Sequence, residues 1–176
     1  MNQHLLITGK PGVGKTTLVT KVITEIKEMK PNWLISGFYT KELRQSGRRI
    51  GFDIYTLDGQ QGILARSNDP KLMSKFRVGK YSVVTTDLED LVVPLLYEST
   101  DLLILDELGK MELFSSKFRN AVIFAFNNQT RIFATLPFYE NPFLASIKSR
   151  SDIKIWELTQ SNRLHIFEEI VKFLEI

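Results

Sequence analysis

Residues 9–17 of the chain read GKPGVGKTT and follow directly on the short apolar run Leu5–Ile7. Three of the ten glycines of the sequence fall in this stretch, which satisfies the pattern G-x-x-x-x-G-K-[ST]. Glycines at these positions let the backbone wrap so that successive N–H groups point inward and hold phosphate oxygens. We expect a strand over about 3–8 before the loop and an amphipathic helix over about 15–29 after it, an order typical of α/β proteins.

Each part of this loop has an expected role toward a bound triphosphate. Lys15 supplies positive charge to the terminal phosphates during catalysis, and we expect the hydroxyl of Thr16 to bind Mg²⁺. The positive end of the helix that begins here adds to the attraction. The expected nucleotide-binding residues of the loop are Gly9, Lys10, Pro11, Gly12, Val13, Gly14, Lys15, Thr16 and Thr17. An ordinary glycine-containing surface loop is the alternative, and the expected strand and helix on either side argue against it.

A second motif, LLILDE at residues 102–107, ends an apolar strand with two acids. Such an apolar run is typical of a strand buried on both faces, and it places Asp106 at the strand's carboxyl end, where open α/β sheets bind ligands. Asp106 is the second expected Mg²⁺ ligand, through a coordinated water. Glu107 is the candidate that orients or deprotonates the water attacking the γ-phosphate. A strand-end acid in a surface salt bridge is the alternative for Glu107.

The turn after these acids contains Gly109 and Lys110. Lys110 is a candidate for the positive charge that stabilises the transition state of phosphoryl transfer, and a solvated lysine is the alternative. Arg77 and Arg163 are further candidates for this charge. The guanine-reading motif N-K-x-D does not occur in the sequence, so the preferred base stays open.

The remaining pattern predicts one domain, residues 1–176, with a mainly parallel central sheet and an antiparallel, β-rich insertion over about 33–66. Predicted insertion strands cover about 33–43, 50–57 and 61–65, and later strands cover about 81–85, 102–106, 131–135 and 153–158. Predicted helices cover about 86–95, 115–127, 141–149 and a segment that begins after 161. We expect Thr86 and Glu89 to form a capping box and Ser161 to cap the last helix.

Composition restricts the class of protein further. The chain has no cysteine, which excludes disulfides and cysteine-ligated metal centres. The N-terminus has no basic lead, and no apolar run reaches the ~18 residues of a membrane span. We therefore expect a monomeric, cytoplasmic protein without a membrane partner. Basic clusters at 41–50 and 66–80 are read as solvated faces, with an anionic ligand beside them as the alternative.

Several longer motifs carry a resemblance to a known family: GFYTKELR, RRIGFDIYTLDG, RVGKY and DELGKMEL, together with the loop at 9–17. In these motifs the chain resembles the small P-loop nucleoside-triphosphatases, which include thermostable prokaryotic enzymes and the animal cancer-related nucleoside-triphosphatase. The resemblance implies a RecA-like three-layer sandwich and Mg²⁺-dependent hydrolysis of ATP, GTP, CTP and UTP to diphosphate and phosphate. It also implies that a second wall faces the nucleotide, formed by Leu103, Ile104, Leu105, Asp106, Glu107, Leu108, Gly109 and Lys110.

Two other functions fit the same loop. A small-molecule or nucleotide kinase uses it too, but needs a site for a phosphoryl acceptor, and the sequence contains no arginine-rich lid. A RecA-like nucleic-acid-binding switch would use the basic clusters, and its binding would weaken steeply with salt. The modest net charge of +3 makes nucleic acid the weaker expectation, with nucleoside triphosphates as the expected partners.

Overall fold

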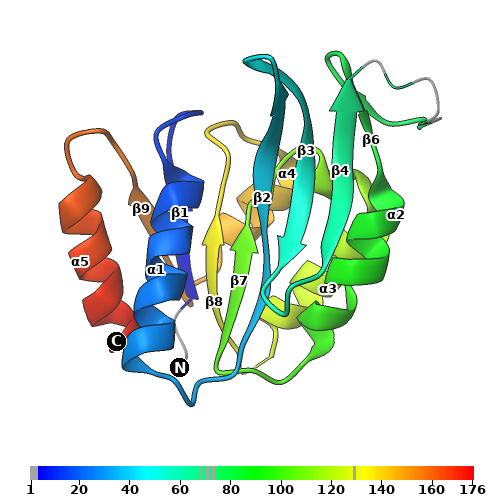
Figure 1. Cartoon of the computed structure of the whole chain (residues 1–176). Coiled ribbons are helices and arrows are strands. Elements are labelled where there is room, and N and C mark those ends of the chain that lie inside the picture. Colours follow the sequence, from blue (N-terminus) through cyan, green and yellow to red (C-terminus); the bar gives the residue numbers. More distant parts are fainter. Residues whose placement is uncertain (1–3, 68, 70–71, 73, 129) are drawn as a thin grey trace.

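A computed structural model describes residues 4–67, 69, 72, 74–128 and 130–176. In these residues the strands are β1 (His4–Thr8), β2 (Ile35–Gln45), β3 (Arg48–Thr56), β4 (Gln61–Ser67), β5 (Arg77–Val78), β6 (Tyr81–Val83), β7 (Leu102–Asp106), β8 (Arg131–Thr135) and β9 (Ile153–Glu157). The α-helices are α1 (Lys15–Met29), α2 (Thr85–Asp87), α3 (Ser116–Phe126), α4 (Pro142–Lys148) and α5 (Arg163–Leu174). Short helical segments are the π-helix η1 (Leu88–Val92) and the 3₁₀ turns η2 (Pro94–Tyr97) and η3 (Glu112–Phe114). The fold is α/β: strands and helices alternate except in the run from β2 to β6, which contains no helix among the described residues (Figure 1).

The strands form one mixed sheet in the order β5-β6-β4-β3-β2-β7-β8-β1-β9. Pairings are parallel from β2 through β7, β8 and β1 to β9, and antiparallel from β2 through β3, β4 and β6 to β5. The expectation of a mainly parallel sheet is therefore only partly right. A tight turn at Ser46-Gly47, with φ values of 48° and 76°, returns β3 beside β2, and the antiparallel part then extends through β4 and β6 to β5.

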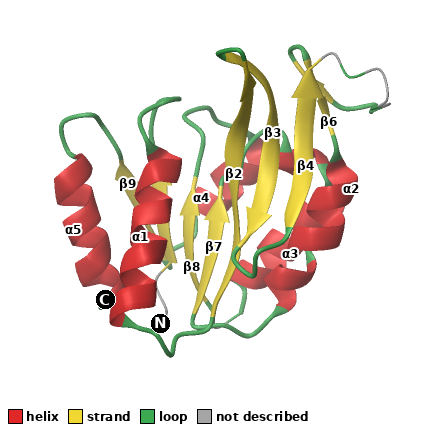
Figure 2. Ribbon diagram, in the orientation of Figure 1, coloured by secondary structure: helices red, strands yellow, loops and turns green. Residues whose placement is uncertain are grey.

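Helices cover both faces of the parallel part, which gives three layers (Figure 2). Helices α1 and α5 lie on one face, and α3 and α4 on the other. Alternate residues of β7 serve the two layers: Leu103 and Leu105 enter the core under α3, and Leu102 and Ile104 enter the core under α1 and α5. The strand is buried along its whole length, as its apolar sequence predicts.

Two predicted helix caps are wrong. Helix α2 begins after Val84 and no side chain caps it, whereas Glu89 accepts a hydrogen bond from Ser115 Oγ at 2.7 Å. The last helix begins after Asn162, whose amide oxygen accepts the backbone N–H of Thr159 at 2.8 Å. The glutamate of the expected capping box is therefore bound by Ser115, and the last helix begins after Asn162 and not after Ser161.

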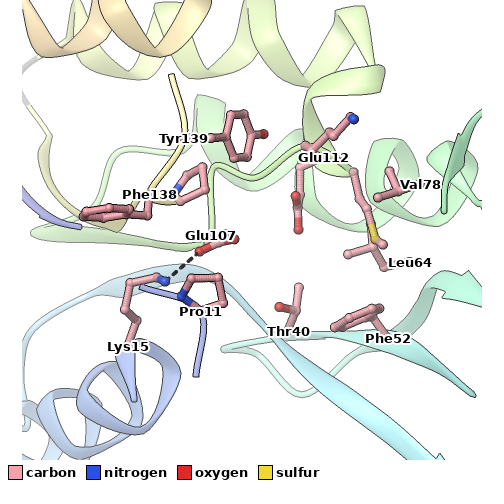
Figure 3. A pocket seen from close by; sticks show the side chains of 13 residues that line it. Pro11, Lys15, Thr40, Phe52, Leu64, Val78, Glu107, Glu112, Phe138 and Tyr139 are labelled. Carbon is pink, nitrogen blue, oxygen red and sulfur yellow. Dashed lines mark ion pairs between the residues drawn. The ribbon is translucent and has the colours of Figure 1, made fainter. Parts of the chain in front are cut away.

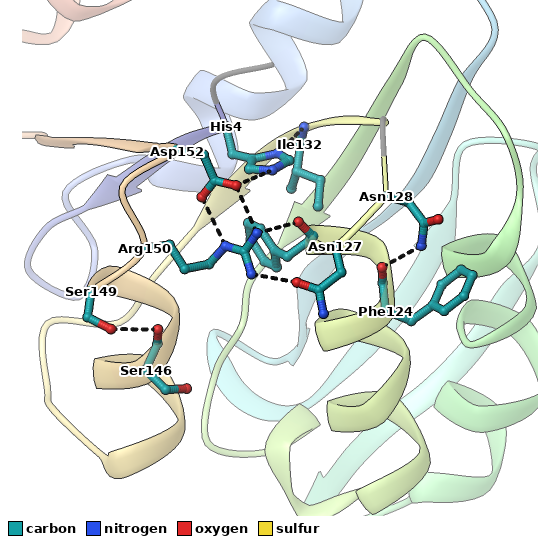
Figure 4. A network of polar contacts seen from close by, with 10 residues as sticks. His4, Phe124, Asn127, Asn128, Ile132, Ser146, Ser149, Arg150 and Asp152 are labelled. Carbon is teal, nitrogen blue, oxygen red and sulfur yellow. Dashed lines mark hydrogen bonds and ion pairs between the residues drawn. The ribbon is translucent and has the colours of Figure 1, made fainter. Parts of the chain in front are cut away.

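At the amino end of β1, a polar network joins three elements (Figure 4). Arg150 donates to Asp152 Oδ1 at 2.9 Å, to Asn127 Oδ1 at 2.7 Å and to the carbonyl of Phe126 at 2.6 Å. The buried His4 accepts the N–H of Ile132 at Nδ1. Burial lowers the pKa of His4, and the nearby Asp152 opposes that shift. This histidine has a structural role: it lies at the amino end of β1, and the loop at 9–17 follows the opposite end of that strand.

Among the helices of the described residues, none has both the length and the apolar character needed to cross a membrane.

Candidate active site

The loop at 9–17 joins the end of β1 to the start of α1. Gly14, with a φ of 102°, is the residue before the helix and adopts a conformation that favours glycine. No side chain caps this helix and its first turn holds no acid, so its free N–H groups are available to an anion. Lys15 folds back over the loop and donates to the carbonyl of Gly9 at 3.1 Å.

Asp106 ends β7 in an almost fully buried position. The Thr135 hydroxyl, at the end of the neighbouring β8, donates to its Oδ1. Its Oδ2 is buried and has no hydrogen-bond partner within the described part of the chain. Burial raises the pKa of Asp106, and the hydroxyls of Thr135 and Thr16 and the charge of Lys15 oppose that shift. One oxygen of this carboxylate is therefore anchored and the other is left for a ligand.

Glu107 lies directly opposite the lysine of the loop. Its Oε2 is 3.5 Å from Lys15 Nζ, the ion pair drawn in Figure 3. Burial raises the pKa of Glu107, Lys15 opposes the shift, and the neighbouring Asp106 adds to it. The two motifs, about ninety residues apart in the sequence, thus meet in one contact.

A cavity of about 460 Å³ opens beside this ion pair. Its walls come from the loop at 9–17, from β2 to β5, and from the segments that follow β7 and β8. The lining residues are Pro11, Lys15, Thr40, Phe52, Leu64, Val78, Glu107, Lys110, Met111, Glu112, Pro137, Phe138 and Tyr139. The cavity therefore lies where the parallel and antiparallel parts of the sheet meet, and we call it the β-side cavity.

Glu112 is a second carboxyl group in this cavity (Figure 3). A methyl group on Gly109 would lie 2.7 Å from Glu112 Oε2 and 3.1 Å from Glu107 Oε1, so both side chains pack against the same α-carbon. Burial raises the pKa of Glu112 to about 8, with Glu107 and Asp106 adding to the shift and backbone N–H groups opposing it. No ion pair among the described residues includes Glu112.

A second cavity, of about 450 Å³, lies on the other flank of the loop against α5, and we call it the α-side cavity. Its lining residues are Gly12, Gly14, Thr17, Leu18, Lys21, Arg163, Leu164 and Phe167. Arg163 Nε donates to the carbonyl of Val13 at 2.9 Å, and Lys21 Nζ lies 3.7 Å from the centre of the Phe167 ring. Cationic and aromatic side chains thus lie together beside the loop at 9–17.

Not all the candidates reach these cavities. Leu103, Ile104, Leu105 and Leu108 are buried in the core and line neither cavity, so they position the acids. Lys110 lines the β-side cavity and Arg163 the α-side cavity, whereas Arg77 lies exposed on β5 and lines neither.

The basic residues of the antiparallel part are used in contacts within that part. Arg49 donates to Tyr81 Oη at 2.9 Å and pairs with Glu42, which also binds Arg44 at 2.6 Å. Because Glu42 neutralises part of this charge locally, the cluster at 41–50 is less cationic than its sequence indicates.

Sequence reasoning gave no role to several residues that form the site. Thr135 ends the strand next to β7, a place that the strand-end rule for ligands also covers. Glu112 is the second glutamate of the DELGKMEL motif, which is the signal that points to it. Thr40 and Phe52 lie in the motifs GFYTKELR and RRIGFDIYTLDG, but only the packing of distant elements brings them, and Phe167, to the cavities.

Taken together, a glycine-rich loop before a helix and an acid pair at the end of a nearby strand define the class: an α/β protein that binds nucleotides. Within it, the chain belongs to the NTPase family, whose model matches residues 4–171. Nucleoside-triphosphatase THEP1 of Thermotoga maritima is 45% identical over 174 residues, 97% of this chain and 95% of that protein. The human cancer-related nucleoside-triphosphatase is 40% identical over 184 residues, covering 97% and 96%.

Solved structures show the same fold. The crystal structure of THEP1 from the hyperthermophile Aquifex aeolicus matches with a TM-score of 0.85 and 36% identity, covering 98% of this chain and 99% of that one. The solution structure of a human cancer-related nucleoside triphosphatase matches with a TM-score of 0.83 and 39% identity, covering 97% and 96%. The predicted resemblance to this family is therefore confirmed.

Proposed function

We propose that this chain hydrolyses nucleoside triphosphates to nucleoside diphosphate and phosphate at the contact between Lys15 and Glu107. Membership of the NTPase family supports a hydrolase. The observation that carries the residue assignment is the 3.5 Å ion pair, because it puts the lysine of the loop and a carboxylate side by side, where both can reach one bound phosphate. The free N–H groups at the start of α1 then hold the phosphates.

Glu107 is the proposed general base. Burial raises its pKa, which makes its carboxylate a stronger proton acceptor than an exposed glutamate. In the proposed step, water loses a proton to Glu107 as its oxygen attacks the γ-phosphorus, and the bond to the bridging oxygen breaks. Lys15 stabilises the charge that develops on the phosphate oxygens. Lys110, on the same cavity wall, is the nearest further candidate for this stabilisation.

Thr16 and Asp106 would hold Mg²⁺, and the donor set fits this ion. Asp106 presents a buried Oδ2 without a hydrogen-bond partner in the described part of the chain, and the Thr16 hydroxyl faces the same carboxylate. Mg²⁺ is usually bound by one or two protein oxygens together with water and substrate phosphates, so a large acidic cluster is not needed. When bound, the ion would neutralise charge on the β- and γ-phosphates.

Broad base tolerance is supported by the α-side cavity. The exposed Leu164 and the Lys21–Phe167 pair offer a stacking and cation–π surface, and such surfaces accept any base because every base has a π-face. Thr17 is the single uncharged hydrogen-bonding side chain in that lining. The proposal is that the nucleoside lies there with its phosphates in the loop.

A RecA-like P-loop architecture is the finer fold that we propose. It is supported by the position of the loop between β1 and α1, and by the acid pair on β7, one strand removed from β1 with β8 between them. The monomeric state and the cytoplasmic location stay predictions.

Phosphate release from ATP, GTP, CTP and UTP, each with and without Mg²⁺, tests the function. We expect release from all four with rates within about tenfold of one another, since stacking discriminates weakly between bases. We also expect release to be lost when EDTA removes the metal. Strict selectivity for one base would overturn the assignment of the base to the α-side cavity, and undiminished release in EDTA would overturn the metal assignment.

A further inference from the structure

The β-side cavity is larger than hydrolysis requires. Its volume is about 460 Å³, within the ~300–1,000 Å³ typical of small-molecule sites. A water molecule takes up only about 30 Å³ of liquid volume. Lys15 and Glu107 occupy one side of the cavity, and the rest extends away from them to β3, β4 and β5. The attacking water therefore accounts for a small part of the space beside the reacting groups.

The far walls of this cavity are apolar and aromatic. Phe52, Leu64, Val78 and Met111 line it, and Figure 3 shows the first three on the side of the cavity away from Lys15. Phe138, 53% exposed, stands on the side of Lys15. A cavity of this kind stabilises a molecule with a flat apolar body far more than it stabilises water.

Polar groups in the same cavity limit what that molecule can be. Thr40 lies on the wall of the cavity, and its hydroxyl has no hydrogen-bond partner among the described residues. Glu112 is buried beside Glu107, and Lys15 already pairs with Glu107. Lys15 and Lys110 match these two carboxyl groups in number, so the lining needs no further counter-charge, and a neutral hydroxyl finds both an acceptor and a donor there. The polar lining thus selects a neutral, hydroxyl-bearing molecule.

We propose that the β-side cavity binds a neutral, hydroxyl-bearing aromatic molecule that accepts the γ-phosphoryl group in place of water. The inference rests on the proposed function, because the triphosphate must lie in the loop at 9–17. The aromatic body packs on Phe52 and Met111, and Thr40 and Glu112 bind its polar groups. Its hydroxyl occupies the position of the attacking water beside Glu107.

The transfer step balances without a further reactant. The acceptor's hydroxyl oxygen forms a bond to the γ-phosphorus, and the bond from that phosphorus to the bridging oxygen breaks. The nucleoside diphosphate leaves with the electron pair of that bond, and the hydroxyl proton passes to Glu107. The products are a phosphate monoester and a nucleoside diphosphate, and hydrolysis is the same step with water as the acceptor.

Ribonucleosides are suitable probes because they combine an aromatic ring with free hydroxyls and carry no charge. Binding of adenosine, guanosine, cytidine and uridine is measured by calorimetry with the loop saturated by ADP and Mg²⁺, so that the α-side cavity is not free. Transfer is measured by incubating each probe with γ-labelled ATP and separating labelled phosphate from labelled nucleoside monophosphate. We expect at least one probe to bind and to become labelled.

Variants place the probe in the cavity. Thr40→Val and Glu112→Leu should each weaken probe binding, by roughly 3- to 10-fold for one lost hydrogen bond. Thr40→Ser keeps the hydroxyl and should bind as the wild type does. Thr24→Val, on the exposed face of α1, is the matched control and should also change nothing.

The outcomes separate the two proposals. If the protein neither binds ADP nor releases phosphate from ATP, the proposed function fails and the acceptor site fails with it. If ATP is hydrolysed but no probe binds, or a probe binds without becoming labelled, the acceptor site alone is overturned. Probe binding that Thr40→Val and Glu112→Leu leave unchanged would show that the probe lies elsewhere, which also overturns it.

Discussion

The two parts of the sheet contribute to the site in different ways. The parallel part consists of β2, β7, β8, β1 and β9. Its residues with proposed chemical roles lie in the loops that follow β1 and β7, and each loop holds one short contiguous motif. The antiparallel part contributes single side chains from separate strands, such as Thr40, Phe52 and Leu64. A parallel strand ends at one edge of the sheet, so its motif reaches the site by topology alone. An antiparallel strand reaches it only if register and twist bring the right residue there.

Glu107→Gln is expected to have the largest effect, because it removes the proposed general base. It tests whether the chemistry depends on the parallel part of the sheet. The variant keeps the shape of the side chain but accepts no proton, so turnover should fall by about 10²- to 10⁴-fold while nucleotide binding stays near the wild-type value. Steady-state phosphate release and ADP binding measure the two quantities. Glu28→Gln on the exposed face of α1 is the control. Undiminished release in Glu107→Gln would contradict the assignment of the base.

Lys15→Ala should weaken both nucleotide binding and turnover, because the proposed role of Lys15 is to contact the phosphates before and during the reaction. We expect kcat/KM to fall by roughly 100-fold, with a rise in the Kd of ADP. Lys27→Ala, an exposed residue on the same helix, is the matched control. A change in kcat alone, with the Kd of ADP unaltered, would contradict the proposed contact with bound phosphate.

Gly37→Ala tests the junction between the two parts. Gly37 lies on β2, which pairs with β7 on one side and β3 on the other, and its φ is 121°. A methyl group there would lie 1.9 Å from the carbonyl oxygen of Ile104, so the strands must separate. We expect the free energy of unfolding to fall by about 3 kcal/mol or more, measured by urea denaturation.

Gly47→Ala is the comparison for that variant. Gly47 also has a positive φ, of 76°, but a methyl group there meets no atom within 4 Å. Only the conformational cost of about 1–2 kcal/mol applies. Equal destabilisation by the two substitutions would show that the close approach of β2 and β7 is not what Gly37 permits.

Glu112→Gln should have an effect on stability that depends on pH. The pKa of Glu112 is raised from 4.5 to about 8 in the folded protein, mainly by burial. The folded state therefore binds more protons than the unfolded state between these values, and the free energy of unfolding falls as the pH rises through that window. Glutamine does not titrate, so the stability of the variant relative to wild type should increase from about pH 5 to about pH 8.

Urea denaturation of both proteins across that window measures the difference, and Glu28→Gln should follow the wild-type curve. Parallel curves for wild type and Glu112→Gln would show that Glu112 does not hold a proton to higher pH in the folded protein.

Much of the parallel part was predictable from the sequence because its signals are local. Strand β7 and strand β8 were predicted with their observed bounds, and α1 from Lys15 to Met29 likewise. Buried parallel strands read as apolar runs, and the helix after the loop repeats its apolar residues at helical spacing. The misplaced caps at Thr86 and Ser161 show the limit of such signals: a distant serine, Ser115, binds Glu89, and a local contact with Thr159 makes Asn162 the residue before the last helix.

By itself, the sequence determined the loop at 9–17, the acids at 106 and 107, and the resemblance to the nucleoside-triphosphatases, because each depends on neighbours within a few positions. Tertiary structure alone decided that Glu112 shares the site with Glu107, that Thr135 anchors Asp106, and that the antiparallel strands close a cavity beside Lys15. These contacts join residues from different strands and loops. Their distances depend on sheet order and register, which a local pattern does not specify.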